Sequence, residues 1–320
     1  MTENRLDNLK KVMTGERANG KNQKLNRPEK PVTMNLEFRE LKLDDLPAIK
    51  ELSDSMGMLN DPKIGDIAEA ILRDPKNYFY GAFKEKKLVG VGRLRGKSKN
   101  LAWIESIRVH GRYQRKGIGT KLFRYGEKIA RERNYRIVGY QTVTENKGSC
   151  RIGEILGFQR KHEMTAFYLN PNEFPKIDDK YIKQTPVPIE EALNLLEQIP
   201  NGPKEEICTG WSYAPIEFEF FKSEPDMDFF FSEGTVLLEY RDRDFNTNEI
   251  AFVKAILYGS NKNVQELLSD FIRRNAERNL WLVCLCPDHL IPSVLKMGFQ
   301  YAKVWTGNKN VVVLFTKELA

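Results

Sequence analysis

The sequence predicts an α/β (α+β) fold made of two similar halves. The chain has 320 residues, enough for two domains of ordinary size that each bury a core. In both halves, alternating strand patterns are interleaved with amphipathic helix patterns. A segment that reads as strand, turn and helix at 103–122 returns in altered form from 251 onward, which indicates a tandem arrangement.

The composition indicates a globular protein with a mixed, charged surface. Hydrophobic residues make up 41% of the chain, charged residues make up 30%, and the net charge is +7. A basic protein can attract nucleic acid, anionic lipid or a polyanionic cofactor. Because 51 Lys and Arg are scattered among 44 Asp and Glu, the charges favour a solvated mixed surface over a nucleic-acid partner. No apolar run approaches the roughly 18 residues of a membrane span, and the polar N-terminus is unlike a signal peptide, so the expected location is cytoplasmic.

The cysteines and histidines favour no metal site. The four cysteines form no C-x-x-C pair and have no histidine partners at metal-binding spacing, and the chain has only three histidines. We therefore expect buried, reduced thiols. Cys284 and Cys286 lie two apart in an apolar run, so both are expected on one side of a strand.

The order of the elements predicts how the chain is divided. Residues 1–34 are rich in Lys, Arg and Asn without a sustained period, which predicts a basic, flexible arm. A first domain is expected at 35–170, and Pro171 and Pro175 mark a linker at 171–180. Its expected elements are strand 36–41, helices 44–56 and 63–73, strands 78–83 and 88–94 joined by a hairpin-like turn at 84–87, strand 103–109, a helix from 118, strand 136–142, helix 146–156, and two closing strands at 158–160 and 164–169.

The turn at 114–120 is the strongest chemical signal in the chain. Two glycines let the backbone approach a ligand closely, and two cations stand beside them. Free amides at the start of the following helix and the positive end of its dipole complete an anion site that suits a pyrophosphate. The residues of this site are Gln114, Arg115, Lys116, Gly117, Ile118, Gly119 and Thr120.

This turn resembles the Gln/Arg-x-x-Gly-x-Gly/Ala motif of acetyl-coenzyme A binding in the GNAT superfamily of N-acetyltransferases. Asn146 and the triplet Leu156-Gly157-Phe158 also stand where that family has an Asn opening a helix and a Leu-Gly-Phe closing it. The resemblance implies a catalytic GNAT domain with acetyl-coenzyme A as co-substrate. It also implies two tandem GNAT-like domains, each a mixed, mostly antiparallel twisted sheet flanked by helices.

The resemblance further implies how the acetyl group is held and moved. The strand backbone at Ile107 and Val109 would bind the pantetheine arm and polarise the thioester, and Asn146 would contact the cofactor. A primary amine would attack directly in a ternary complex. The acceptor stays open between a small amine or amino-acid-like molecule and a protein amine. A non-catalytic acetyl-coenzyme A sensor or scaffold is one alternative, and monomer and homodimer both stay open. Binding of nucleic acid by the basic arm and surface, with acetylation of an associated protein, is the remaining alternative.

Glu105 is the candidate base. An alkylamine has a pKa of about 10, so a carboxylate is needed to take its proton near neutral pH. The segment from Ile104 to Val109 resembles that of polyamine and diamine acetyltransferases, in which the corresponding Glu is the base. Strand alternation predicts that Glu105 shares a face with Ile107 and Val109. The alternative is that Glu105 only pairs with Arg93 or Arg95.

The general acid is less clear, because Gly153 stands where many family members have a tyrosine. Tyr168 is slightly preferred as a substitute, since it falls on an expected closing strand. Ser149, Cys150, Tyr140 and water are the other candidates.

The second half, 181–320, is predicted to be a degenerate GNAT-like domain. Twelve residues run from Gly111 to Leu122 but nine from Gly259 to Leu267, and the shortened turn has no paired glycines. We therefore expect one cofactor site, in the first half. The aromatic and acidic stretch 211–228 would line a slot for a cationic amine if it faced the first half; otherwise its aromatics are core and its acids solvated.

Overall fold

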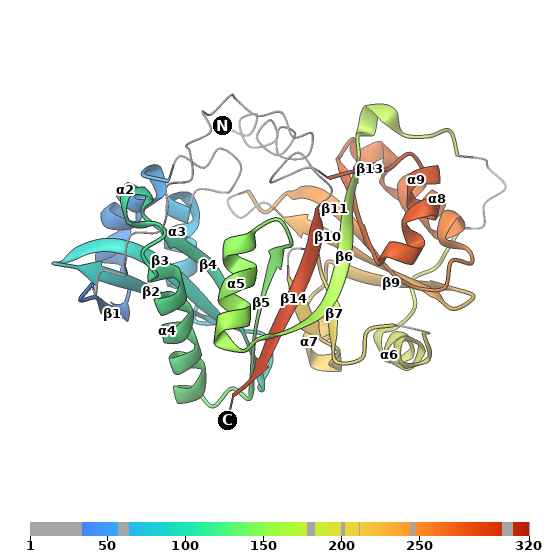
Figure 1. Ribbon diagram of the computed structural model, residues 1–320. Coiled ribbons are helices and arrows are strands. Elements are labelled where there is room, and N and C mark those ends of the chain that lie inside the picture. Colours follow the sequence, from blue (N-terminus) through green and yellow to red (C-terminus); the bar gives the residue numbers. More distant parts are fainter. Residues whose placement is uncertain are drawn as a thin grey trace.

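A computed structural model describes residues 34–56, 64–177, 183–199, 202–210, 212–243, 247–302 and 310–319 (Figure 1). The predicted N-terminal arm, apart from Met34, and the end of the predicted linker lie outside the described residues. No helix in the described part of the chain is both long and apolar enough to cross a membrane. In the same part, no group of three or more His, Cys, Asp or Glu side chains is arranged to hold a metal ion.

The first half follows the predicted order of elements as far as the helix α5. Its elements are β1 (Glu37–Glu40), α2 (Leu46–Asp54), α3 (Ile64–Arg73), β2 (Asn77–Lys84), β3 (Lys87–Gly96), β4 (Leu101–Val109), α4 (Ile118–Glu132), β5 (Ile137–Val143), α5 (Lys147–Leu156) and β6 (Gln159–Leu169). The predicted hairpin between β2 and β3 is confirmed. Glu85 and Lys86 have φ of 50° and 68°, as a tight two-residue hairpin turn requires.

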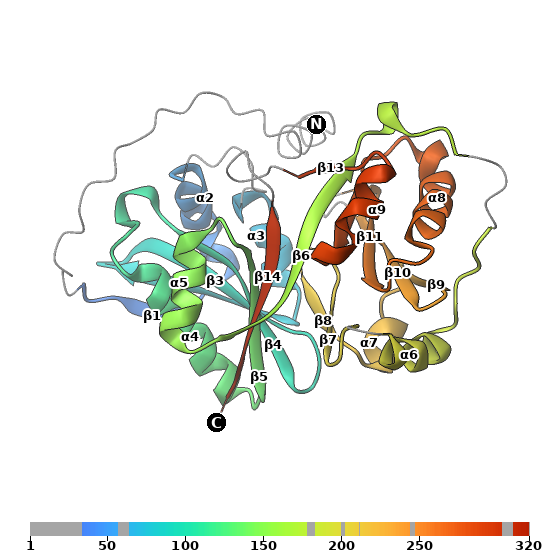
Figure 2. The ribbon, with the colours of Figure 1, turned by 45° about the vertical axis from the view of Figure 1, so that its right-hand side comes forward.

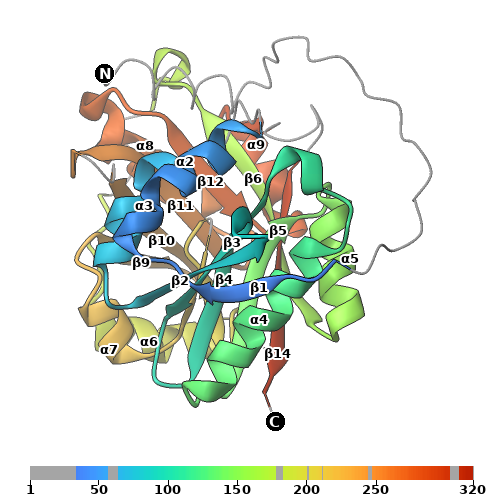
Figure 3. The ribbon, with the colours of Figure 1, turned by 90° about the vertical axis from the view of Figure 1, so that its left-hand side faces the viewer.

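Helices cover both faces of the first sheet (Figure 3). On one face, Leu122 and Phe123 of α4 pack against Ile104 of β4 and Tyr140 of β5 in one buried cluster. On the other face, α2 and α3 cover only the β2 and β3 end. The remaining part of that second face, over β4 and β5, lies against the second half of the chain, where Trp103 and Tyr213 have ring centroids 6.3 Å apart.

The second half repeats the architecture of the first. Its elements are α6 (Ile189–Gln198), β7 (Glu206–Cys208), β8 (Tyr213–Pro215), α7 (Phe218–Lys222), β9 (Met227–Ser232), β10 (Thr235–Arg243), β11 (Ile250–Gly259), α8 (Val264–Asn275), β12 (Leu282–Cys286), α9 (Ile291–Lys296), β13 (Gln300–Tyr301) and β14 (Val311–Glu318). The run β11–α8–β12–α9 reproduces β4–α4–β5–α5, so the predicted repeat is confirmed. Cys284 and Cys286 lie in one buried cluster, as expected, and all four cysteines are buried and form no disulfide among the described residues.

The two halves exchange their closing strands. The strand order is β1-β2-β3-β4-β5-β14-β6-β12-β11-β10-β9, so the C-terminal strand β14 lies between β5 and β6 of the first half (Figure 2). The prediction of two closing strands at 158–160 and 164–169 is wrong, because β6 is continuous. Its first part pairs with β14, and its last part, from Thr165 to Leu169, pairs with β12 of the second half.

This exchange places the end of the chain in the core of the first half. The sequence predicts a boundary between the two domains at 171–180. In the structure, residues 311–318 from the second half of the chain complete the sheet of the first half. Phe315 is 2% exposed and stacks on Tyr140 with ring centroids 5.0 Å apart. Neither half therefore has a complete sheet made only from its own consecutive residues.

Replacing Phe315 with alanine is expected to lower the free energy of unfolding by about 3–5 kcal/mol, because a buried aromatic ring is lost from the core. Chemical denaturation followed by circular dichroism measures this loss. Glu318→Ala, at an exposed position of the same strand, is the control and should change stability by less than about 0.5 kcal/mol. If Phe315→Ala were as mild as the control, β14 would not belong to the core of the first half.

Candidate active site

The strands β4 and β5 separate in the middle of the first sheet. They pair in parallel only from Leu101 to Trp103, opposite Ile137 to Gly139. In the described part of the chain, the rest of β4 pairs with β3 alone, so its other edge is free. Unpaired backbone N–H and C=O groups in such a gap can bind an extended ligand as an added strand would.

A β-bulge in β4 accompanies the separation. Arg93 pairs with Glu105 and Val91 with Arg108, so Ser106 and Ile107 stand opposite a single residue of β3. Ser106 has φ +56°, and a bulge of this kind bends its strand. The bulge also interrupts side-chain alternation. Ile107 packs with the cluster under α4, whereas Glu105 faces the other side, so the expectation that they share a face is wrong.

The turn after β4 has the open space that the sequence predicts for an anion. Arg115 and Gly117 have φ of +61° and +79°, and α4 begins at Ile118. A Cβ atom added at Gly117 would meet nothing within 4 Å, and one at Gly119 would meet only Ile152 Cδ1, at 3.4 Å. Since no atom of the described residues requires glycine at position 119, a ligand that approaches the backbone accounts best for it.

The same turn is electrostatically suited to a pyrophosphate. The first amides of α4 have no partner within the helix, and the helix dipole is positive at this end. The side chains of Arg115 and Lys116 are exposed beside it. The Gln114 side-chain amide donates to the Val109 carbonyl at 3.2 Å and ties the turn to the end of β4. The residues present therefore fit the polyanionic part of coenzyme A.

Asn146 lies at the start of the neighbouring helix α5. Its side chain accepts a hydrogen bond from the Ser149 amide at 3.2 Å and caps the helix. The contact between Gly119 and Ile152 shows that α4 begins beside α5. A direct role for Asn146 in binding coenzyme A stays a prediction.

Glu105 forms an ion pair with Arg93 on the adjacent strand. Its side chain is 21% exposed, and that of Arg93 is 10% exposed. The pairing that the sequence offered as an alternative to catalysis is therefore present. It fixes the orientation of the carboxylate through Oε1, and within the described residues Oε2 has no partner, so the pair does not block proton transfer.

Gln141 is a residue of this site that sequence reasoning missed. It lies on β5, two residues beyond the last paired position, across the gap from Glu105. Its Nε2 donates to the Gly210 carbonyl of the second half at 3.1 Å, and its buried Oε1 has no partner in the described part of the structure. Gln141 follows Gly139 by two residues, so the two share a face of the strand. A polar residue at this position was the sequence feature that could have identified it.

The absence of a tyrosine at position 153 has a steric cause. A Cβ atom at Gly153 would clash with the hydroxyl of Tyr140, whose ring fills this space and whose Oη donates to the Ser149 carbonyl at 2.9 Å. Burial raises the pKa of Tyr140 and also that of the Cys150 thiol. Both groups are therefore poorer acids than they are in water.

The structure does not bring Tyr168 to Glu105. Tyr168 lies on the part of β6 that pairs with β12, and its hydroxyl donates to Gln300 Oε1 at 3.0 Å. Two strands, β5 and β14, stand between β4 and β6, which corresponds to about 14 Å across the sheet. Tyr168 was preferred as the acid because it was expected on a closing strand of the first half. The strand exchange places it beside the second half instead.

The second copy lacks both features of the site. Here β11 and β12 stay paired from Val253 to Ile256, past the position where β4 and β5 have already separated. The turn after β11 is contacted by a side chain of the neighbouring strand β10. Thr235 Oγ1 lies 2.8 and 2.7 Å from the carbonyl oxygens of Ser260 and Lys262. This geometry supports the prediction that the cofactor site occurs once.

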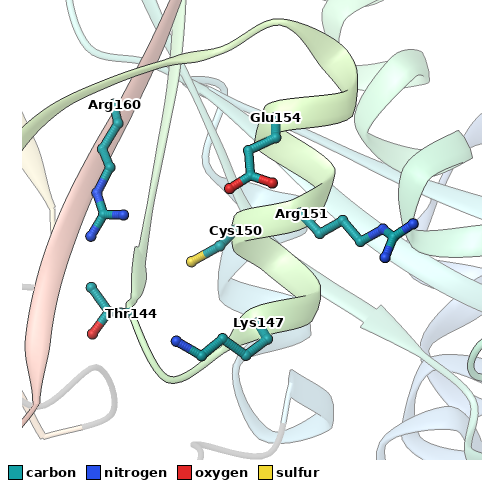
Figure 4. A pocket seen from close by; sticks show the side chains of 6 residues that line it. All are labelled: Thr144, Lys147, Cys150, Arg151, Glu154 and Arg160. Atoms are coloured by element: carbon teal, nitrogen blue, oxygen red, sulfur yellow. The ribbon is translucent and has the colours of Figure 1, made fainter.

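A cavity of about 390 Å³ lies beside α5 and is lined by Thr144, Lys147, Cys150, Arg151, Glu154 and Arg160 (Figure 4). Glu105 and the 114–120 turn are not among its lining residues. It is therefore distinct from the gap between β4 and β5.

The chain is similar to known acetyltransferases in sequence over one segment and in fold over most of its length. Residues 40–158 match the model of the Acetyltransferase (GNAT) family. Among curated proteins, no sequence matches this chain. Among solved structures, a Thermoplasma acidophilum protein described as an acetyltransferase is 12% identical, with a TM-score of 0.58 over 88% of this chain and 100% of that chain.

Two further structures share the whole architecture. A Pyrococcus horikoshii protein, also described as an acetyltransferase, is 14% identical, with a TM-score of 0.51 over 92% of this chain and 93% of that one. A tandem GNAT protein from the clavulanic acid biosynthesis pathway is 14% identical, with a TM-score of 0.51 over 89% and 98%. At these identities the structures establish the fold. The family match covers residues 40–158, so this segment is similar to GNAT acetyltransferases, and the chain has the fold of a tandem GNAT protein.

Proposed function

We propose that this protein transfers the acetyl group of acetyl-coenzyme A to a primary amine by direct attack in a ternary complex. The observation that carries the proposal is that, among the described residues, the gap between β4 and β5 and the open turn at 114–120 occur together in the first half and not in the second. The second half keeps the two corresponding strands and the helix, although it has neither the gap nor the open turn. Ligand binding is therefore the best reason for their presence in the first.

The chain supplies the binding groups from the backbone of two elements. Ile107 and Val109 on the free edge of β4 hold the pantetheine arm, and the turn from Gln114 to Thr120 holds the pyrophosphate. Acetyl-coenzyme A supplies the activated thioester. Backbone amides that point at the thioester oxygen are worth most in a site from which water is excluded.

Glu105 removes the proton from the acceptor amine. Its orientation is fixed by Arg93, and it lies on the face that the second half covers. Water protonates the leaving thiolate, because the buried Tyr140 and Cys150 are poor acids and Tyr168 is two strands away from β5. A thiolate is a tolerable leaving group without a dedicated acid.

A non-catalytic sensor of acetyl-coenzyme A is the second candidate. It is favoured by the ion pair of Glu105 with Arg93 and by glycine at position 153. In this case the cofactor would bind in the same gap without transfer.

Detection of free thiol during incubation with acetyl-coenzyme A and a panel of primary amines separates the two functions. The enzyme hypothesis predicts amine-dependent thiol release. Binding of acetyl-coenzyme A, seen as a thermal shift, without release from any amine would support the sensor. Absence of both would refute the proposed function.

A further inference from the structure

A row of three cations lies beside the base on the face that the second half covers. The β3–β4 register sets Arg93 opposite Glu105 and Arg95 opposite Trp103, and the Lys97 amide donates to the Leu101 carbonyl. Alternation along β3 therefore directs Arg93 and Arg95 to the side of the sheet that carries Glu105 and Trp103.

Of these three cations, Arg93 alone forms an ion pair in the described part of the chain. Arg93 pairs with Glu105, whereas Arg95 and Lys97 form no ion pair or side-chain hydrogen bond within the described residues. Both side chains are only partly exposed, and Arg95 Nε is buried without a partner. A partly desolvated cation without an ion pair is costly, so such groups favour an anionic ligand.

The surroundings of Lys97 include charged groups of both halves. Burial lowers the pKa of Lys97 to about 8. Glu105 and Glu224 oppose this shift, and Arg95 and Arg93 add to it. Glu224 belongs to the second half, so Lys97 stands between the base and the second half.

Two cations of the second half, Lys254 and Arg241, are already paired. Lys254 Nζ lies 2.8 Å from Asp242 and over the rings of Tyr240 and Phe252, at 4.9 and 5.0 Å. Arg241 likewise pairs with Asp228, at 2.7 Å. The cations without an ion pair near Glu105 are thus Arg95 and Lys97, as far as the described residues go.

We propose that the acetyl acceptor is a primary amine that also carries a carboxylate, which Arg95 and Lys97 bind while the amine faces Glu105. This rests on the proposed acetyltransferase function and names its substrate class. Arg95 lies opposite Trp103, which is two residues from Glu105 along β4, and the Lys97 backbone bonds to Leu101, which is four residues from Glu105. These separations correspond to about 7 and 13 Å along the strand. An amine separated from its carboxylate by several carbon atoms spans this distance better than an α-amine.

Three acceptors of one chain length test the proposal: aminohexanoate with a terminal amine, hexylamine and diaminohexane. Their amines and alkyl chains match, and only the far end differs, being anionic, apolar or cationic. We expect kcat/KM for aminohexanoate to exceed that for hexylamine by about 10- to 100-fold, the range for one or two charge-assisted contacts. Diaminohexane should be the poorest of the three.

The double variant Arg95→Met, Lys97→Met should reduce this preference to about threefold or less, since both cationic contacts are removed. Lys99→Met, an exposed lysine on the same turn, is the matched control and should keep the wild-type preference. The thermal midpoint and acetyl-coenzyme A binding of each variant show that it is folded.

Each outcome has a separate meaning. Equal or better use of hexylamine or diaminohexane by the wild-type protein would overturn the carboxylate proposal while leaving the acetyltransferase intact. Persistence of the preference in the double variant would show that other residues bind the carboxylate. No thiol release with any of the three amines, and no saturable binding of hexanoate by calorimetry, would overturn both proposals.

Discussion

Gly119→Asp is expected to lower kcat/KM for acetyl-coenzyme A by about 1000-fold, the equivalent of losing two charge-assisted hydrogen bonds. The new carboxylate would occupy the space above the turn where the pyrophosphate binds, and its charge would repel the phosphates. The protein has room for it, because the nearest atom to a Cβ there is Ile152 Cδ1 at 3.4 Å. An acidic residue in the first turn of a helix is also favourable, so the thermal midpoint should not fall.

Gln265→Asp provides the matched control. Gln265 is the second residue of α8, as Gly119 is the second residue of α4, so both variants put a carboxylate at the same place in the repeat. The control should retain wild-type kinetics. Equal losses in both variants, or none in Gly119→Asp, would contradict the assignment of the cofactor to the first half.

Glu105→Gln is expected to lower kcat by about 100-fold or more at neutral pH, as loss of a general base does. The amide can still accept a hydrogen bond from Arg93, so the geometry of the strand pair should persist. As the pH approaches the pKa of the free amine, about 10, more acceptor is already neutral and the activity of the variant should approach that of the wild type. Initial rates of thiol release between neutral and alkaline pH measure this profile.

Glu163→Gln is the control for this change. Glu163 is also a strand residue paired with an arginine, Arg160, but it lies on β6 and is half exposed. It should show the wild-type profile. A loss in Glu105→Gln that is the same at every pH would assign Glu105 a structural role with Arg93 and remove it as the base.

Local patterns were sufficient to predict most elements and the cofactor turn. Hairpin chemistry at Glu85 and Lys86, the apolar face of α4 and the glycines of the turn each act within a few residues of sequence. The second copy was equally informative. Its closed β11–β12 pair and the turn contacted by Thr235 are consistent with what its missing glycines predicted.

Features that depend on distant pairing were not predictable in the same way. A closing hairpin and an exchanged strand have the same alternation, so residues 159–169 gave no sign that β6 pairs with β14 and β12. Tyr168 was therefore assigned to the wrong surroundings. The bulge at Ser106, a non-glycine residue at positive φ, reversed the face of Ile107. Arg95 and Lys97 gained significance only when the second half was seen to cover them.

The stoichiometry of acetyl-coenzyme A binding, measured by isothermal titration calorimetry, tests the central claim most directly. The account predicts one molecule per chain for the wild-type protein and for Gln265→Asp, and no measurable binding for Gly119→Asp. Two molecules per chain, or undiminished binding in Gly119→Asp, would contradict a single cofactor site formed by the open strands and the glycine turn of the first half.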